Sequence, residues 1–189
     1  MKNIETTLTT EAIFSNDQTK RYLLKKAWDS SKKNVVIIML APSEASGIML
    51  DNTTLLVLNN AYRLGYGSVT IVNLFATLND FALKQAEDSD SENLKIILKA
   101  SKSADVIIYA AGVGKAKNKV FKKRQTQVLT ALQTYENKLH CLCDSIGNSR
   151  LQHPLSPAVR EWHLSSLHIG ELITNEDNAN SQTNSQSNL

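Results

Sequence analysis

Apolar runs of strand length alternate with amphipathic stretches along most of this chain. The most continuous run, residues 35–40, is rich in β-branched side chains and ends just before Pro42. Such a run predicts a strand that is buried on both faces, and we expect it to be the central one. Similar runs predict three further strands, at 68–74, 105–110 and 139–143.

Helical periodicity fills the intervals between these runs. Helices are predicted at 53–64, where Gly65 ends the pattern, at 94–102 and at 119–135. The alternation of strands and helices predicts an α/β fold, a three-layer αβα arrangement with a mainly parallel four-stranded central sheet. Residues 21–28 fit either a short edge strand or a helix, and the pattern does not decide between them.

Length and composition predict one domain with polar ends. A chain of 189 residues, 42% of them apolar, can bury a core of ordinary size. Residues 1–20 are rich in Thr and lack periodicity, so we expect a loose arm followed by a single domain at 21–173. Residues 174–189 are almost entirely polar, and this composition predicts a disordered tail.

The hydropathy pattern gives no sign of a membrane segment. No stretch approaches the roughly 20 consecutive apolar residues that span a bilayer, and no apolar signal core follows the polar N-terminus. We therefore expect a cytoplasmic protein without a membrane partner. The sequence does not determine the oligomeric state, and a monomer is the default.

Two short motifs suggest a metal or a cofactor only weakly. Cys141 and Cys143 stand beside His140, but no second ligand cluster accompanies them, so we expect reduced, buried thiols and no metal. Gly112 and Gly114 lack the third glycine and the acidic residue of a dinucleotide site. No cofactor is expected.

The net charge is only +3, yet basic residues crowd one short stretch. They are Lys115, Lys117, Lys119, Lys122, Lys123 and Arg124. Such a stretch can bind phosphates through charge and counterion release, or it can be a solvated helix face. Alone it does not establish that the chain binds nucleic acid.

Polar breaks follow the predicted strands at three places: residues 41–44, Asn73 and residues 153–157. Ligands of open α/β sheets bind outside the carboxyl ends of the strands. If the strands are parallel neighbours, we expect these breaks to meet in one cleft.

Several short motifs also stand in a distinctive order. They are Arg21-Tyr22-Leu23-Leu24, Leu40-Ala41-Pro42-Ser43, Asp51-Asn52-Thr53-Thr54, Gly65-Tyr66-Gly67, Val72-Asn73-Leu74-Phe75-Ala76 and His153-Pro154-Leu155. Over about 21–157 this order resembles a family of uncharacterised bacterial proteins that is designated only as a domain of unknown function. It also resembles the uracil-DNA glycosylase superfamily, whose first strand ends in a Pro-containing water-binding loop, whose second ends in Asn, and whose late loop begins His-Pro.

The second resemblance implies a DNA glycosylase-like hydrolase that cleaves the N-glycosidic bond of an extruded base. Glycosylases carry Asp, Glu or Asn just before the Pro of the first loop, whereas this chain has Ala41. Unmodified uracil therefore cannot be assigned as the substrate, and a modified base is an extension of the hypothesis. Two alternatives stay open: a non-catalytic module that binds DNA or a nucleotide, and an enzyme that acts on free nucleosides or nucleotides.

The resemblance also implies roles for individual residues. His153 would donate a hydrogen bond to the base as it leaves, although it could instead cap a turn. Asn73 would read the edge of a pyrimidine beside a stacking wall that includes Phe75, or it could simply tie a strand end to the next loop. Pro42 and Ser43 would complete the base-binding loop, where Ser43 could bind a phosphate or the water.

Two carboxylates are candidates for positioning the water, and one serine for contacting the DNA. Glu44 and Asp51 are the nearby carboxylates, but Asp51 precedes a predicted helix and is equally suited to cap it. Ser156 lies in a segment that resembles the loop that pinches the DNA backbone in glycosylases. The six basic residues named above would add contacts to phosphates.

Overall fold

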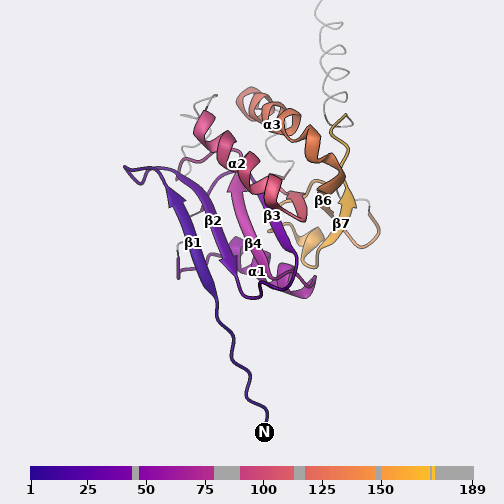
Figure 1. The fold of residues 1–189 in the computed structure, drawn as a ribbon. Coiled ribbons are helices and arrows are strands. Elements are labelled where there is room, and N and C mark those ends of the chain that lie inside the picture. Colours follow the sequence, from indigo (N-terminus) through magenta and orange to yellow (C-terminus); the bar gives the residue numbers. More distant parts are fainter. Residues whose placement is uncertain (44–46, 79–89, 113–117, 148–149, 171, 173–189) are drawn as a thin grey trace, which may run out of the picture.

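Seven strands form one mixed sheet in this computed structural model, which describes residues 1–43, 47–78, 90–112, 118–147, 150–170 and 172. The strands are β1 (Thr9–Phe14), β2 (Arg21–Ala27), β3 (Asn34–Met39), β4 (Ser68–Asn73), β5 (Val106–Tyr109), β6 (Leu139–Cys143) and β7 (His163–Ser166). Their order across the sheet is β1-β2-β4-β3-β5-β6-β7, so β3 is the central strand, as predicted (Figure 1).

The sheet has a parallel core with antiparallel strands on both sides. The four strands predicted from the apolar runs form this core, in the order β4-β3-β5-β6. Strands β1 and β2 extend it on one side and β7 on the other, all with antiparallel pairing. The predicted α/β fold is confirmed, whereas the predicted four-stranded sheet is wrong. The side chains of edge strand β1 are mostly exposed and those of β7 are exposed or partly buried, so neither strand carries an apolar run.

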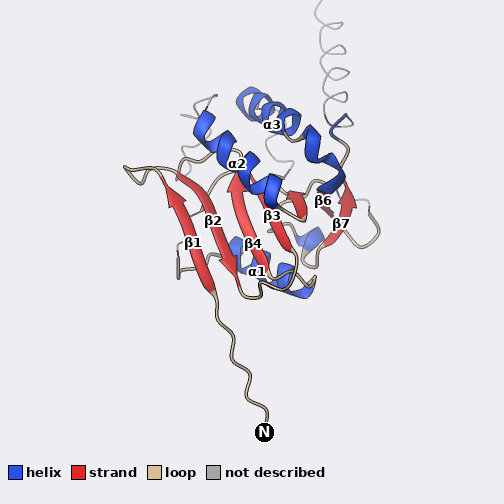
Figure 2. Cartoon of the chain, viewed as in Figure 1, coloured by secondary structure: helices blue, strands red, loops and turns tan. Residues whose placement is uncertain are grey.

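Helices cover both faces of this sheet (Figure 2). Helix α1 (Asn52–Arg63) lies on one face, and α2 (Ser91–Ser103) and α3 (Lys119–Ala131) lie on the other. Each helix begins at a side chain that accepts a hydrogen bond from the backbone N–H three residues later: Asp51, Asp90 and Asn118 respectively. Helix α3 ends before the predicted boundary, because 133–138 form a 3₁₀ helix.

Each face of the sheet has its own hydrophobic core, and β3 contributes to both. Val35 and Ile37 pack with Val57 of α1, whereas Val36 and Ile38 pack with the residues of α2 and α3. These four β3 side chains are at most 2% exposed. A fully buried aliphatic side chain contributes roughly 1.5–3 kcal/mol of transfer free energy, so this strand anchors the two layers to each other.

The expected loose arm at 1–20 needs correction, because Thr9–Phe14 form β1 and pair with β2. Strand β1 is held in place by backbone hydrogen bonds to β2 rather than by burial of its own side chains. Side-chain periodicity gives no information about such backbone pairing. The undecided segment 21–28 contains β2, which lies inside the sheet between β1 and β4. The predicted tail at 174–189 lies outside the described residues.

Among the residues that the structure describes, no helix is both long enough and apolar enough to cross a membrane.

Candidate functional site

The three polar breaks lie at the carboxyl ends of three adjacent strands. Pro42 and Ser43 follow β3, and Asn73 is the last residue of β4, where it pairs with Met39 of β3. His153 packs against Gly112, which follows β5 on the other side of β3. The topology therefore brings the segments to one edge of the sheet, and their meeting in a single cleft stays a prediction.

Asp51 links this edge to the start of α1. Its carboxylate accepts a hydrogen bond from the N–H of Thr54 at 2.6 Å and another from the Ser43 side chain. Burial alone would raise the pKa of Asp51, but these hydrogen bonds and the nearby Arg21 guanidinium hold it below its ordinary value. Asp51 is thus both a helix cap and an ionised carboxylate at the end of β3.

Arg21 is a member of this cluster that the sequence analysis did not single out. It is only 1% exposed, and its guanidinium donates to the Ser43 carbonyl oxygen at 3.1 Å. Burial lowers the pKa of Arg21, while the Asp51 carboxylate opposes that shift. Arg21 begins β2 within the motif Arg21-Tyr22-Leu23-Leu24, but nothing in that motif marks a charge as buried. Arg21 holds the loop after β3 in place and balances the charge of Asp51.

His153 has a defined hydrogen-bonding state. Its Nδ1 accepts a hydrogen bond from the backbone N–H of Leu155 at 3.2 Å. Because a backbone N–H is only a donor, the neutral ring carries its hydrogen on Nε2. Burial lowers the pKa of His153, and the Asp51 carboxylate raises it in part. At neutral pH His153 therefore presents an uncharged imidazole with Nε2–H as a donor.

The loop that carries His153 is anchored on both sides. The N–H of Gln152 donates to the carbonyl oxygen of Leu142 in β6 at 3.4 Å. Gly112 has φ of +78°, and a Cβ atom at this position would lie 3.2 Å from the Cβ of His153. Glycine is therefore favoured at 112, both for its positive φ and because a side chain there would press on His153.

Asn73 has an amide group with unused hydrogen-bonding capacity. The residue is 1% exposed, and its Nδ2 has no partner among the described residues. By strand alternation its side chain lies on the same face as Val69 and Ile71, which is the face that α1 covers. A buried amide without a partner costs free energy, so this group would be stabilised by an acceptor that reached it. The Asn73 carbonyl oxygen, in contrast, accepts a hydrogen bond from Asn93.

The structure does not bring Phe75 to this face. Phe75 is 4% exposed and belongs to the core cluster on the side of α2 and α3. The sequence pattern located it next to Asn73 along the chain, but neighbouring positions around a strand end point in different directions. Ser156 uses its hydroxyl within its own loop, donating to the Gln152 side chain at 2.8 Å.

The basic stretch is only partly a surface. Arg124 is 1% exposed, because it lies on the inward side of α3 with Phe121 and Val128. Its Nε donates to the carbonyl oxygen of Leu74 at 2.8 Å, so it holds the end of β4 and does not face a phosphate. This corrects its predicted contact with the DNA backbone. Lys119 and Lys123 are exposed, and Lys122 is partly buried. Glu44, Lys115 and Lys117 lie outside the described residues.

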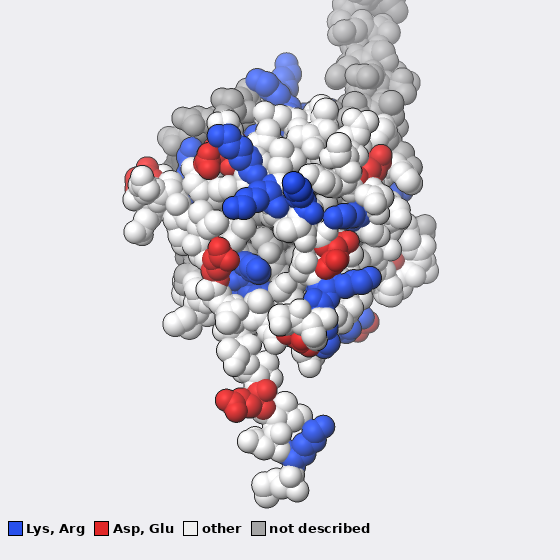
Figure 3. Space-filling model, in the orientation of Figure 1, with Lys and Arg blue, Asp and Glu red and all other residues white. Residues whose placement is uncertain are grey.

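Basic side chains also gather over α2, where the sequence analysis did not expect a patch (Figure 3). The exposed lysines of this helix are Lys95, Lys99 and Lys102, and Lys95 pairs with Glu92 at 3.4 Å. Their spacing repeats along one outer side of the helix, which is typical of a solvated face. This side of the molecule lies opposite the face that α1 covers.

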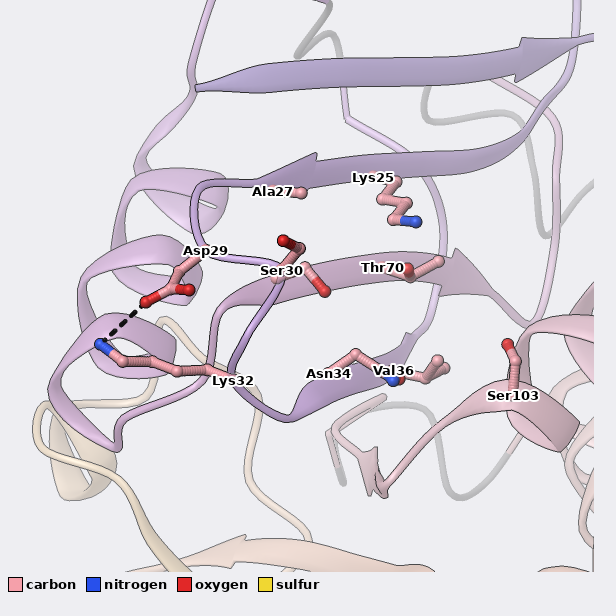
Figure 4. A pocket seen from close by; sticks show the side chains of 10 residues that line it. Lys25, Ala27, Asp29, Ser30, Lys32, Asn34, Val36, Thr70 and Ser103 are labelled. Carbon is pink, nitrogen blue, oxygen red and sulfur yellow. Dashed lines mark ion pairs between the residues drawn. The ribbon is translucent and has the colours of Figure 1, made fainter. Parts of the chain in front are cut away.

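A hollow of about 310 Å³ lies on the α2 side of the sheet, close to the amino ends of β3 and β4. Its floor contains Lys25, Thr70 and Val36, which are cross-strand neighbours on β2, β4 and β3 (Figure 4). Asp29 and Lys32, which form an ion pair at 3.4 Å, stand at its rim. None of the predicted site residues lines this hollow, so it is separate from the edge at which Asp51 and His153 lie.

Cys141 and Cys143 are buried free thiols in β6. Within the described residues, no three His, Cys, Asp or Glu side chains stand close enough together to hold a metal ion.

Comparison with known families assigns the chain. Residues 21–155 match the model of a family described as protein of unknown function, DUF1643. The chain belongs to this family. The DUF1643 region begins at Arg21 and ends just after His153, so it includes both of these residues as well as Ser43, Asp51 and Asn73. No curated protein matches the chain.

Proposed function

We propose that this protein is a DNA glycosylase-like hydrolase, which cleaves the N-glycosidic bond of a base that has been extruded from DNA. The observation that carries the proposal is the state of His153, a half-buried neutral imidazole whose Nε2–H has no acceptor among the described residues. It stands near an ionised carboxylate, Asp51, at the carboxyl edge of the parallel core of the sheet. This combination suits cleavage of a glycosidic bond, in which negative charge develops on the departing base and positive charge on the sugar.

Departure of the base is the step that His153 would assist. Cleavage of the bond between base and sugar leaves the electron pair on the base, which becomes anionic. A neutral donor aimed at a base carbonyl oxygen stabilises that charge as it develops and stays protonated throughout. The hydrogen bond from Leu155 to Nδ1 keeps the hydrogen of the ring on Nε2, so the donor does not alternate between the two nitrogens.

Asp51 and Ser43 would act on the sugar side. The sugar becomes an oxocarbenium-like cation, which a nearby carboxylate stabilises and which water then attacks at the anomeric carbon. Asp51 stays ionised because Ser43, Thr54 and Arg21 favour its charged form. It can therefore orient a water and accept its proton, a task that Ala41 has no group to perform.

Asn73 would select the base. Its unpartnered Nδ2 donates hydrogen bonds, so a base that offers a carbonyl oxygen or a ring nitrogen acceptor at this position would be favoured. A base that offers a donor there would leave two donors facing each other inside a buried site, and such mismatches discriminate strongly.

A free nucleoside or nucleotide is the second candidate substrate, and the burial of Arg124 favours it. With Arg124 inside the protein, fewer cations of the predicted stretch remain to bind a DNA backbone. Replacing Lys119 and Lys123 by Glu separates the two substrates. If the protein acts on DNA, the double variant should lose activity on DNA, and its DNA binding should depend less on salt concentration. Lys33→Glu on the β2–β3 loop is the matched control and should change neither property. Activity on mononucleosides that persists in the double variant would favour the second substrate.

The decisive experiment incubates the protein with DNAs that carry a panel of natural and modified bases and scores alkali-sensitive sites. On the DNA that responds, His153→Ala should lower the rate by about 100- to 1,000-fold, as expected for loss of one preorganised donor. Asn73→Ala should also lower the rate of base release strongly, whereas His163→Ala and Asn59→Ala, which change exposed residues of the same types, should leave it unchanged. No abasic product from any DNA, or full activity in both site variants, would refute the proposal.

A further inference from the structure

A second feature of the molecule involves a buried lysine that does not belong to the group around Asp51 and His153. Lys26 of β2 is 2% exposed, and its Nζ donates to the Thr10 hydroxyl at 3.0 Å and to the Gly47 carbonyl oxygen at 2.7 Å. Both of these acceptors are neutral oxygens. Burial lowers the pKa of Lys26, because the ammonium group has lost water without gaining a carboxylate among the described residues.

The lysine lines a hollow of about 440 Å³ on the α1 side of the sheet. Strands β1 and β2 form its floor, and residues 47–50, which pass behind these strands on the way to α1, form its other wall (Figure 1). Apart from Thr10, Lys26 and Gly47, the lining is apolar: Leu8, Ala12, Ile48 and Leu50. Leu8, Ile48 and Leu50 are 51%, 96% and 39% exposed, so the apolar wall faces water.

We infer that this hollow binds an amphiphilic carboxylate, whose head pairs with the Lys26 ammonium and whose hydrocarbon chain covers Leu8, Ile48 and Leu50. An ammonium group has three N–H donors, and the two bonds that Lys26 makes leave one for a ligand. A carboxylate supplies the charge that the site lacks, and such a charge-assisted bond is stronger than those to neutral oxygens. The chain removes exposed apolar surface from water.

The size of the hollow favours a small molecule over a peptide or protein. Its volume falls within the range of roughly 300–1,000 Å³ that is usual for small-molecule sites. The ligand is therefore a medium-chain fatty acid or a compound of the same type. No residue of the Asp51 and His153 cluster lines the hollow, so this inference does not depend on the proposed function.

Calorimetric titration of the full-length protein with decanoate and with decanol, below the concentrations at which they aggregate, tests the inference. Decanoate should bind saturably and at least about tenfold more tightly than decanol, because only the acid can pair with the ammonium. Lys26→Met should remove this preference. Lys25→Met, the adjacent lysine on the opposite face of β2, should leave it unchanged.

A further variant keeps the test decisive if Lys26→Met does not fold. Ile48 is 96% exposed, so Ile48→Glu leaves the core intact and adds a negative charge beside the bound chain. It should weaken decanoate binding at least about tenfold while decanol changes less. No saturable decanoate binding, equal affinities of acid and alcohol in the natural protein, or undiminished decanoate affinity in Ile48→Glu would overturn the inference.

Discussion

Substituting Gly112 by alanine tests how the fold holds His153, and Gly65 offers a matched control. Both glycines have positive φ, +78° and +81°, so alanine at either position meets the same backbone penalty. That penalty is about 1–2 kcal/mol, partly offset by the lower entropy of the unfolded chain. The two positions differ in their surroundings. A Cβ at 65 would have no atom within 4 Å, whereas a Cβ at 112 would lie 3.2 Å from the Cβ of His153.

The contact at 112 forces His153 or its loop to move by a few tenths of an ångström. Overpacking of this kind costs about 1–3 kcal/mol, so Gly112→Ala should lose about 2–4 kcal/mol of unfolding free energy and Gly65→Ala about 1 kcal/mol. Urea denaturation measures both losses. NMR titration of the His153 ring should show its pKa rising toward the ordinary value in Gly112→Ala alone, because a displaced ring is less buried. Equal losses in the two variants, with an unchanged His153 pKa, would show that Gly112 does not position His153.

Two further predictions concern the charges of the site. Asp51→Asn keeps a good helix cap but loses the charge beside Arg21, so it should lower the unfolding free energy at pH 7 by more than about 0.5 kcal/mol. Because the pKa of Asp51 is lower in the folded protein, its charge stabilises the fold above pH about 4, and this stabilisation is lost as the pH falls through the folded pKa. Urea midpoints measured across this pH range should therefore depend less on pH in Asp51→Asn than in the natural protein. For His153, burial lowers the folded pKa, so the unfolded chain gains a proton first and stability should fall as the pH drops below about 6.5. His153→Gln should reduce this slope in urea titrations at pH 5 to 7, while His163→Gln should not, and the opposite pattern would contradict the assignment.

The parts of the fold that could be predicted are those in which the burial of each side chain is reflected in the pattern of apolar and polar residues along the sequence. Strand β3 is buried on both faces, so its sequence is a continuous apolar run that identifies it without any knowledge of its neighbours. Strand β1 is ordered by backbone pairing at the edge of the sheet, and its exposed side chains follow no pattern. The same reasoning explains Arg124, whose charge predicts a surface although the helix turns it inward.

The candidate site divides in a similar way. A parallel core could be expected from the alternation of strands and helices, and with it the position of Ser43, Asn73 and the loop of His153 at the carboxyl edge of the sheet. The hydrogen-bond partners of these side chains could not be predicted from the sequence. Arg21 reaches Ser43 because β2 lies beside β4 in antiparallel orientation, which no local pattern in 21–28 specifies.

By itself the sequence determined the parallel core, the positions of the helices and the edge at which the polar breaks meet, because hydrophobic periodicity and turn residues act over short distances along the chain. Only the tertiary structure decided which polar groups are buried, which nitrogen of His153 carries the hydrogen, and that Lys26 lies in a hollow that no carboxylate of the described residues lines. These properties depend on what long-range packing places around each group, since burial and hydrogen-bond partners come from segments far apart along the chain.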